Sequence, residues 1–111
     1  MMLGMFAALS AAVAIAAGAF GAHGAASPQA AEWLRTGGVY QLIHAVAAIA
    51  IMSVARGASI LMLAGAAIFA ATLYAMAIGA PKWLGAITPI GGTLMIGAWL
   101  WVAWAYWRLQ A

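Results

Sequence analysis

The chain has 111 residues, of which 69% are hydrophobic and 5% are charged, whereas globular proteins average about 45–50% apolar and about 25% charged residues. A water-soluble fold cannot cover its surface with so few charges, so we expect a single domain, residues 1–111, embedded in the lipid bilayer. The net charge of +3 is spread over isolated residues, which predicts no nucleic-acid partner, and the lack of cysteine excludes disulfides and thiolate metal sites.

Four apolar segments are long enough to cross a bilayer, because a spanning helix needs roughly 20 mainly apolar residues. Only helices or closed barrels satisfy backbone polar groups in lipid, and these segments are continuously apolar rather than alternating. The sequence therefore predicts an all-α membrane protein with four transmembrane helices in an antiparallel bundle. Their expected bounds are Leu3–Ala22, Val39–Ala55, Ala58–Gly79 and Pro89–Trp107.

The first segment carries no Lys or Arg in front of its apolar run, which favours a retained span over a cleaved secretory signal peptide. It also contains rows of small residues four apart, of the kind that let helix backbones pack closely in membranes. Gly18 and Gly21 belong to such rows, and later spans add Gly65, Gly91 and Gly92. These glycines are predicted to mark tight packing within the bundle or, alternatively, a contact between copies in a homo-oligomer.

The connection between the first two spans reads HGAASPQAAEWLRTGG. Ser27 is a suitable N-cap, and Pro28 suits the first helical position, where its missing N–H costs nothing. The sequence predicts a short interfacial helix from Pro28, with Trp33 at the membrane surface. This helix either lies flat on the membrane or continues into the second span, with Gly37-Gly38 as the expected place for a bend.

The other two connections are short, and Thr88 followed by proline repeats the helix-start signal before the fourth span. Four spans place both termini on one side of the membrane, together with Arg56 and Arg108. Arg35 and Lys82 fall on the other side, so the count of basic residues does not decide the orientation. The fourth span is rich in tryptophans that are expected to anchor at the interface or, alternatively, to form a stacking platform: Trp99, Trp101, Trp104 and Trp107.

Polar side chains enter the second span at Tyr40, Gln41 and His44. At about 100° per residue they share one side of a helix, and they are expected to face protein because polar groups are costly in lipid. Four antiparallel spans bring further polar residues to a similar depth. The predicted cluster near one membrane face is His23, Tyr40, Gln41, His44, Tyr74 and Thr88.

This cluster has two interpretations. It is a hydrogen-bond network that orients the helices, or a site for a proton, ligand or cofactor, since histidine titrates near neutral pH. His23 and His44 are able to ligate haem iron, but their spacing does not require it, and a zinc site would need further ligands. We therefore predict no cofactor, no metal site and no enzymatic activity.

Several motifs resemble one known family. They are GAFGAHG at 18–24, W-x-x-T-G-x-x-Y-Q-x-x-H at 33–44, LY at 73–74 and TPIGG at 88–92. In order and spacing they are similar to the YgdD-type family of small bacterial inner-membrane proteins, a domain of unknown function with a eukaryotic transmembrane relative. One departure is FAATLY at 69–74, where the family suggests an FSGSLY-like run, which puts a polar role for that segment in question.

The resemblance implies a four-span protein of the bacterial inner membrane with both termini in the cytoplasm, because members carry basic residues in the second loop and the tail. It implies no activity. We expect a non-enzymatic structural or accessory protein. The alternatives are a small transporter or proton-coupled carrier working as an oligomer, and a membrane protein that binds a ligand through its two histidines. The first span carries no acidic residue of the kind that drives small multidrug exporters.

Overall fold

The computed structural model describes residues 2–110. These residues form four long α-helices and one short 3₁₀-helix, without strands. All four long helices are apolar and long enough to cross a membrane, which confirms the prediction of an all-helical protein with four spanning segments. Their bounds are α1 Met2–His23, α2 Pro28–Ile51, α3 Arg56–Ala77 and α4 Thr88–Gln110, with η1 at Lys82–Ala86.

The α2 helix begins where the local sequence predicts. Ser27 has an extended backbone and its side-chain oxygen accepts a hydrogen bond from the Ala30 backbone N–H at 3.0 Å, with Pro28 in the first turn. This cap satisfies one of the free N–H groups at the start of the helix. At the end of α3, Gly79 has a φ of 108°, a left-handed conformation that glycine adopts without strain.

The expected short helix is not a separate element. Residues from Pro28 to Ile51 form one uninterrupted helix, as in the alternative in which this helix continues into the second span. The two glycines instead make room for neighbouring helices. A Cβ atom at Gly38 would lie 2.9 Å from the Ala14 carbonyl oxygen of α1, and one at Gly37 would lie 2.7 Å from the Tyr74 ring of α3.

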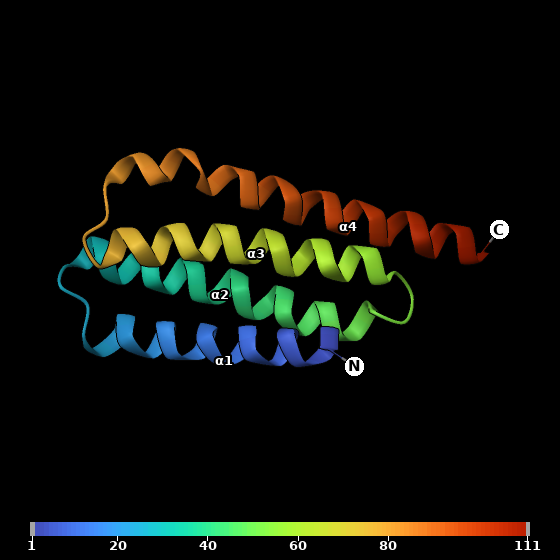
Figure 1. The fold of residues 1–111 in the computed structure, drawn as a ribbon, viewed down its shortest axis with the longest axis horizontal. Coiled ribbons are helices and arrows are strands. Elements are labelled where there is room, and N and C mark those ends of the chain that lie inside the picture. The colour runs from blue at the N-terminus through green and yellow to red at the C-terminus, as the bar shows by residue number, and fades with distance from the viewer. Residues whose placement is uncertain (1, 111) are drawn as a thin grey trace.

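The four helices form an open row. Each helix packs extensively on its neighbour in the chain, while α1 touches α3 only slightly and makes no extensive contact with α4. Figure 1 shows the chain passing along the long axis four times, with the two termini at the same end. The helices α1 and α4 are therefore the two outer members of the row, and both keep most of their surface exposed.

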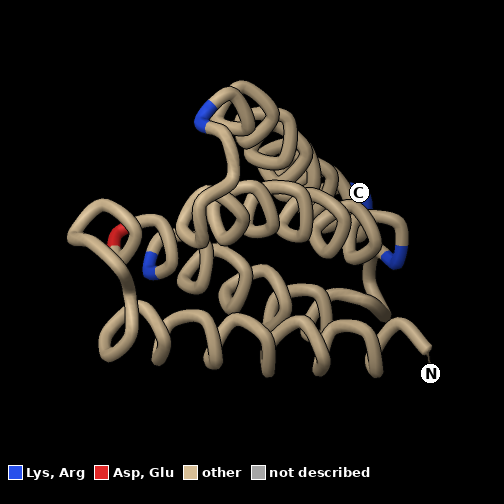
Figure 2. The backbone as a smooth tube through the Cα atoms, turned by 60° about the vertical axis from the view of Figure 1, so that its left-hand side comes forward, with Lys and Arg blue, Asp and Glu red and all other residues tan. Residues whose placement is uncertain are grey.

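Among the described residues the charged ones lie at or near the two ends of the long helices, and the middle of each helix carries no charge (Figure 2). At one end Arg35 and Glu32 form an exposed ion pair at 2.9 Å. At the other end the Arg108 guanidinium lies 4.7 Å from the centre of the Trp104 ring, a favourable cation–π distance. This distribution suits a molecule whose middle lies in hydrocarbon and whose ends meet water.

Tight packing between α3 and α4 centres on two of the predicted glycines. A Cβ atom at Gly91 would lie 2.5 Å from both the Gly65 carbonyl oxygen and the Phe69 backbone nitrogen, and one at Gly65 would lie 2.9 Å from the Gly91 carbonyl oxygen. Between α1 and α2, a Cβ atom added at Gly21 would lie 2.9 Å from the Leu34 Cβ atom. The backbones of these helices therefore touch only because no side chain separates them.

Two predicted packing glycines behave differently. A Cβ atom at Gly18 would meet nothing within 4 Å, and one at Gly92 would meet only the Phe69 ring at 3.9 Å. The Gly18 backbone still lies beneath Gly38, whose added Cβ atom would be 3.5 Å from the Gly18 nitrogen. Gly92 is thus a matched neighbour for Gly91 that differs in packing.

We predict that Gly91→Ala destabilises the protein, whereas Gly92→Ala does not. The Gly91 methyl group must displace the α3 backbone, which by analogy with overpacked cores costs about 1–3 kcal/mol. The Gly92 methyl group has room. Thermal unfolding of the two variants in the same detergent checks this, and equal unfolding temperatures would contradict the packing described for Gly91.

Candidate functional site

Five of the six polar residues predicted to form one cluster lie in three places, and His23 lies apart from all of them. Gln41 and Tyr74 are hydrogen-bonded to each other, His44 is bonded to α4, and Thr88 is bonded to α3. His23 takes part in none of these contacts. The cluster is divided because the helices form a row, in which residues of similar depth on different helices need not be neighbours.

The first place is a chain of hydrogen bonds across α1, α2 and α3. The Gln41 Nε2 group donates to the Ser10 Oγ atom at 3.0 Å, and the Tyr74 hydroxyl donates to the Gln41 Oε1 atom at 2.6 Å. Gln41 is buried and uses both ends of its amide. The prediction missed Ser10, although it is the one polar side chain within the apolar run of the first span, and such residues commonly bond across helices.

The second place joins α2 to α4 near the middle of both helices. The Trp99 indole N–H donates to His44 Nε2 at 3.0 Å, and His44 Nδ1 lies 2.7 Å from the Tyr40 carbonyl oxygen. Because Nε2 accepts, Nδ1 carries the proton and donates to that carbonyl, so the ring is the neutral Nδ1–H tautomer. Trp99 therefore makes an internal hydrogen bond.

The third place joins α3 to the start of α4. The hydroxyl oxygens of Thr72 and Thr88 lie 2.6 Å apart and both side chains are buried. Thr72 also bonds to carbonyl oxygens of its own helix at 3.0 and 3.1 Å. The FAATLY segment thus has a polar role through Thr72. Thr88 turns its hydroxyl toward Thr72 and the Leu84 carbonyl.

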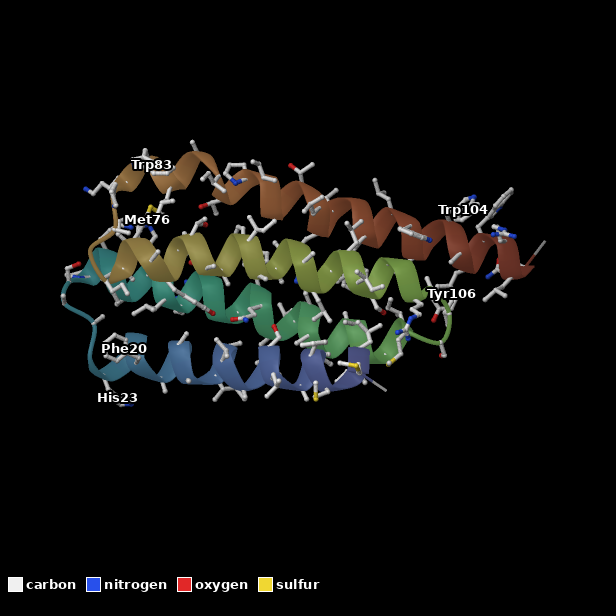
Figure 3. All side chains as sticks on the ribbon, viewed as in Figure 1. Phe20, His23, Met76, Trp83, Trp104 and Tyr106 are labelled. Carbon is white, nitrogen blue, oxygen red and sulfur yellow. The ribbon has the colours of Figure 1, made fainter. Side chains whose placement is uncertain are left out.

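His23 ends α1 with an exposed side chain, and Figure 3 shows it pointing away from the other helices. The two histidines do not meet, so they form no paired site for haem or another cofactor. Within residues 2–110 no three side chains among His, Cys, Asp and Glu come together as metal ligands would. The expectation that His23 joins the cluster is wrong because the end of α1 leaves it at the surface.

A lateral recess of about 380 Å³ lies beside the second place. Aromatic rings form much of its wall. The Tyr40 and Phe69 rings are tilted at 60° with centres 5.1 Å apart, and the His44 and Trp99 rings are edge-on at 67° with centres 5.9 Å apart, both within the favourable distance for aromatic pairs. The lateral recess is lined by Tyr40, His44, Phe69, Gly92, Met95, Ile96 and Trp99.

Comparison with known proteins identifies the relatives of this chain. The family described as "Protein of unknown function (DUF423)" matches residues 17–92. A UPF0382 membrane protein of Staphylococcus saprophyticus is 37% identical, over 84% of this chain and 86% of the relative. One from Haemophilus influenzae is 35% identical, over 94% and 92% of the two chains.

The inner membrane protein YgdD of Escherichia coli, also of UPF0382, is 28% identical, over 86% of this chain and 81% of the relative. No solved structure matches the chain. These relatives confirm the resemblance that the motifs indicate, and the chain belongs to the DUF423 family, whose named relatives are membrane proteins without an assigned activity.

Proposed function

We propose that this integral membrane protein is a non-enzymatic structural or accessory component of the bacterial inner membrane. One observation carries the proposal. Every buried side-chain nitrogen and oxygen among the described residues has a hydrogen-bond partner within the chain. Several of these bonds join one helix to another, which is the structural role that interhelical polar bonds have in membrane proteins.

The position of the bonds supports this role. Gln41 links α2 to both α1 and α3, Thr72 links α3 to α4, and Trp99 links α4 back to α2. Each helix of the open row is therefore tied to at least one other by polar side chains. Such bonds contribute modestly to stability in membranes but fix how helices are rotated against each other.

The proposal includes an antiparallel passage of the four spans through the membrane, with both termini in the cytoplasm. The inner-membrane description of the Escherichia coli relative supports the compartment. The first turns of α2, with the Glu32–Arg35 ion pair, then lie at the outer interface. The exposed outer faces of α1 and α4 leave surface for lipid and for association with further copies.

A proton-coupled carrier is the second candidate, because His44 is a buried titratable group near the middle of α2, beside the lateral recess. Histidine changes its charge in the physiological pH range. In the structure, however, both of its ring nitrogens are hydrogen-bonded. The accessory function is the better supported of the two.

We predict that Gln41→Leu destabilises the protein by about 1–3 kcal/mol, because it leaves the Ser10 and Tyr74 hydroxyls without partners. Thr93→Val is the matched control, since the Thr93 hydroxyl is exposed and bonds only to the Pro89 carbonyl of its own helix. Unfolding in a denaturant series would measure both. A Gln41→Leu protein as stable as the control would remove the structural basis of the proposal.

We predict no pH-driven flux of protons or small organic cations in proteoliposomes, and no difference between wild type and His44→Ala. The carrier candidate makes the opposite prediction. It requires flux that a pH gradient drives and that His44→Ala abolishes, because the transported proton would bind at the one buried histidine. A flux with those two properties would replace the accessory function.

We predict that an engineered cysteine at Gln29 reacts with a membrane-impermeant maleimide in intact spheroplasts. One at Ser53 should react only after permeabilisation. Both positions are exposed. Gln29 lies in the first turn of α2 and Ser53 lies two residues beyond its end, and the natural chain has no cysteine to interfere. The reverse labelling pattern would place the termini outside the cytoplasm, and equal labelling of both positions would contradict a spanning α2.

A further inference from the structure

Tyr40 is an exception among the polar side chains in the middle of the helices. It lies halfway along α2, its side chain is 45% exposed, and its hydroxyl has no hydrogen-bond partner within residues 2–110. A phenol facing hydrocarbon without a partner is unfavourable. Trp101 of α4 is a second exception among the described residues, because its indole N–H has no partner there either. The other polar side chains in the middle of the helices are hydrogen-bonded within the chain: Ser10, Gln41, His44, Ser59, Thr72, Thr93 and Trp99.

Tyr40 is also the free polar group of the lateral recess. The recess contains two other polar side chains, His44 and Trp99, and these are bonded to each other. Both nitrogens of His44 are occupied, so neither residue offers a donor to a further molecule. The lining therefore consists of aromatic and aliphatic side chains, among which Tyr40 carries the one hydroxyl and is not hydrogen-bonded through it within the described residues.

The lateral recess is open because of Gly92. A Cβ atom at this position would lie 3.9 Å from the Phe69 ring, so the lining has space where most residues would place a side chain. Its volume of about 380 Å³ is near the lower end of the range of roughly 300–1,000 Å³ for small-molecule pockets. That size suits one or two fused rings.

We propose that the lateral recess binds a membrane-soluble molecule with a flat ring that carries a carbonyl oxygen. Aromatic walls from Tyr40, Phe69 and Trp99 offer edge and face contacts to a planar ring. The carbonyl oxygen accepts a hydrogen bond from the Tyr40 hydroxyl. A lipid acyl chain fills the same space but leaves this hydroxyl unpaired, so the ring compound is the better match.

The site goes beyond the proposed accessory function and does not rest on it. The hydrogen bonds of Gln41 and Thr72 lie outside the recess lining. A failure to bind a ring compound therefore leaves the stability prediction for Gln41 unchanged. Conversely, if Gln41→Leu proves as stable as its control, the recess and its lining residues are unaffected.

The test uses 2-methyl-1,4-naphthoquinone as the probe and the full chain in lipid nanodiscs. Trp99 lines the recess, so a bound quinone ring quenches its fluorescence with a saturable dependence on concentration. Tyr40→Phe keeps the aromatic wall and removes the hydroxyl, and should weaken binding about 3- to 10-fold, as expected for one lost hydrogen bond. Gly92→Leu fills the recess and should abolish the saturable component.

Tyr106→Phe is the matched control, because Tyr106 is a similarly exposed tyrosine near the end of α4, outside the recess lining. It should bind the probe like wild type. If Gly92→Leu does not fold, as judged by circular dichroism, Tyr40→Phe still decides the question. Quenching that rises without saturation, or equal affinity in wild type and Tyr40→Phe, overturns the proposal.

Two further arms distinguish other occupants of the recess. If a lipid acyl chain fills the recess and the quinone does not displace it, quenching by the quinone shows no saturable component, which overturns the proposal. Ile96→Cys keeps Tyr40 and places a cysteine at an exposed lining position. It forms a disulfide-linked dimer under oxidation if a second copy covers the face. That dimer, formed in full yield and unaffected by the quinone, also overturns the proposal.

Discussion

The interior of a membrane holds no water, so a polar group there has to find its hydrogen-bond partner within the protein. The arrangement of the helices in this protein depends on that constraint. Gln41 meets it by using its amide as donor to Ser10 and as acceptor from Tyr74. One side chain thereby connects three helices. If any of the three residues were rotated away by one helical position, at least two polar groups would be left in an apolar layer, where an unpaired group costs about 1–3 kcal/mol. The bonds therefore select one rotational setting of α1, α2 and α3.

Small residues bring these polar groups within reach. Gly38 lets the backbone of α2 approach Ala14 and Gly18 on α1, and Gly37 gives space to the Tyr74 ring on α3. Lipid supplies no hydrophobic drive for helices to associate, so van der Waals contact at such glycines has to supply the attraction. Close packing and hydrogen bonding thus act at the same level of α2, because Gly37, Gly38 and Gln41 lie within about one helical turn.

The sequence predicts the elements well because their signals are local. Length and apolarity identify the four helices, and the pair Ser27-Pro28 marks the start of α2. The sequence predicts the hydrogen-bond partners of the polar side chains less well. Membrane depth follows from position along a helix, but contact also depends on which helices are neighbours and how each is rotated. His44 bonds to Trp99 of α4, and the His23 side chain is exposed and makes no hydrogen bond within residues 2–110. Depth alone would group both histidines with Tyr74.

In the open row α4 has one extensively packed neighbour, α3. It packs on α3 through Gly65 and Gly91, and it reaches α2 through the single hydrogen bond from Trp99 to His44. Because His44 accepts this bond at Nε2 only while that nitrogen is unprotonated, the neutral tautomer holds the Trp99 ring in place. That ring is also a wall of the lateral recess. The rotation of α4, the tautomer of His44 and the shape of the recess are therefore one coupled feature, set by the same hydrogen bond.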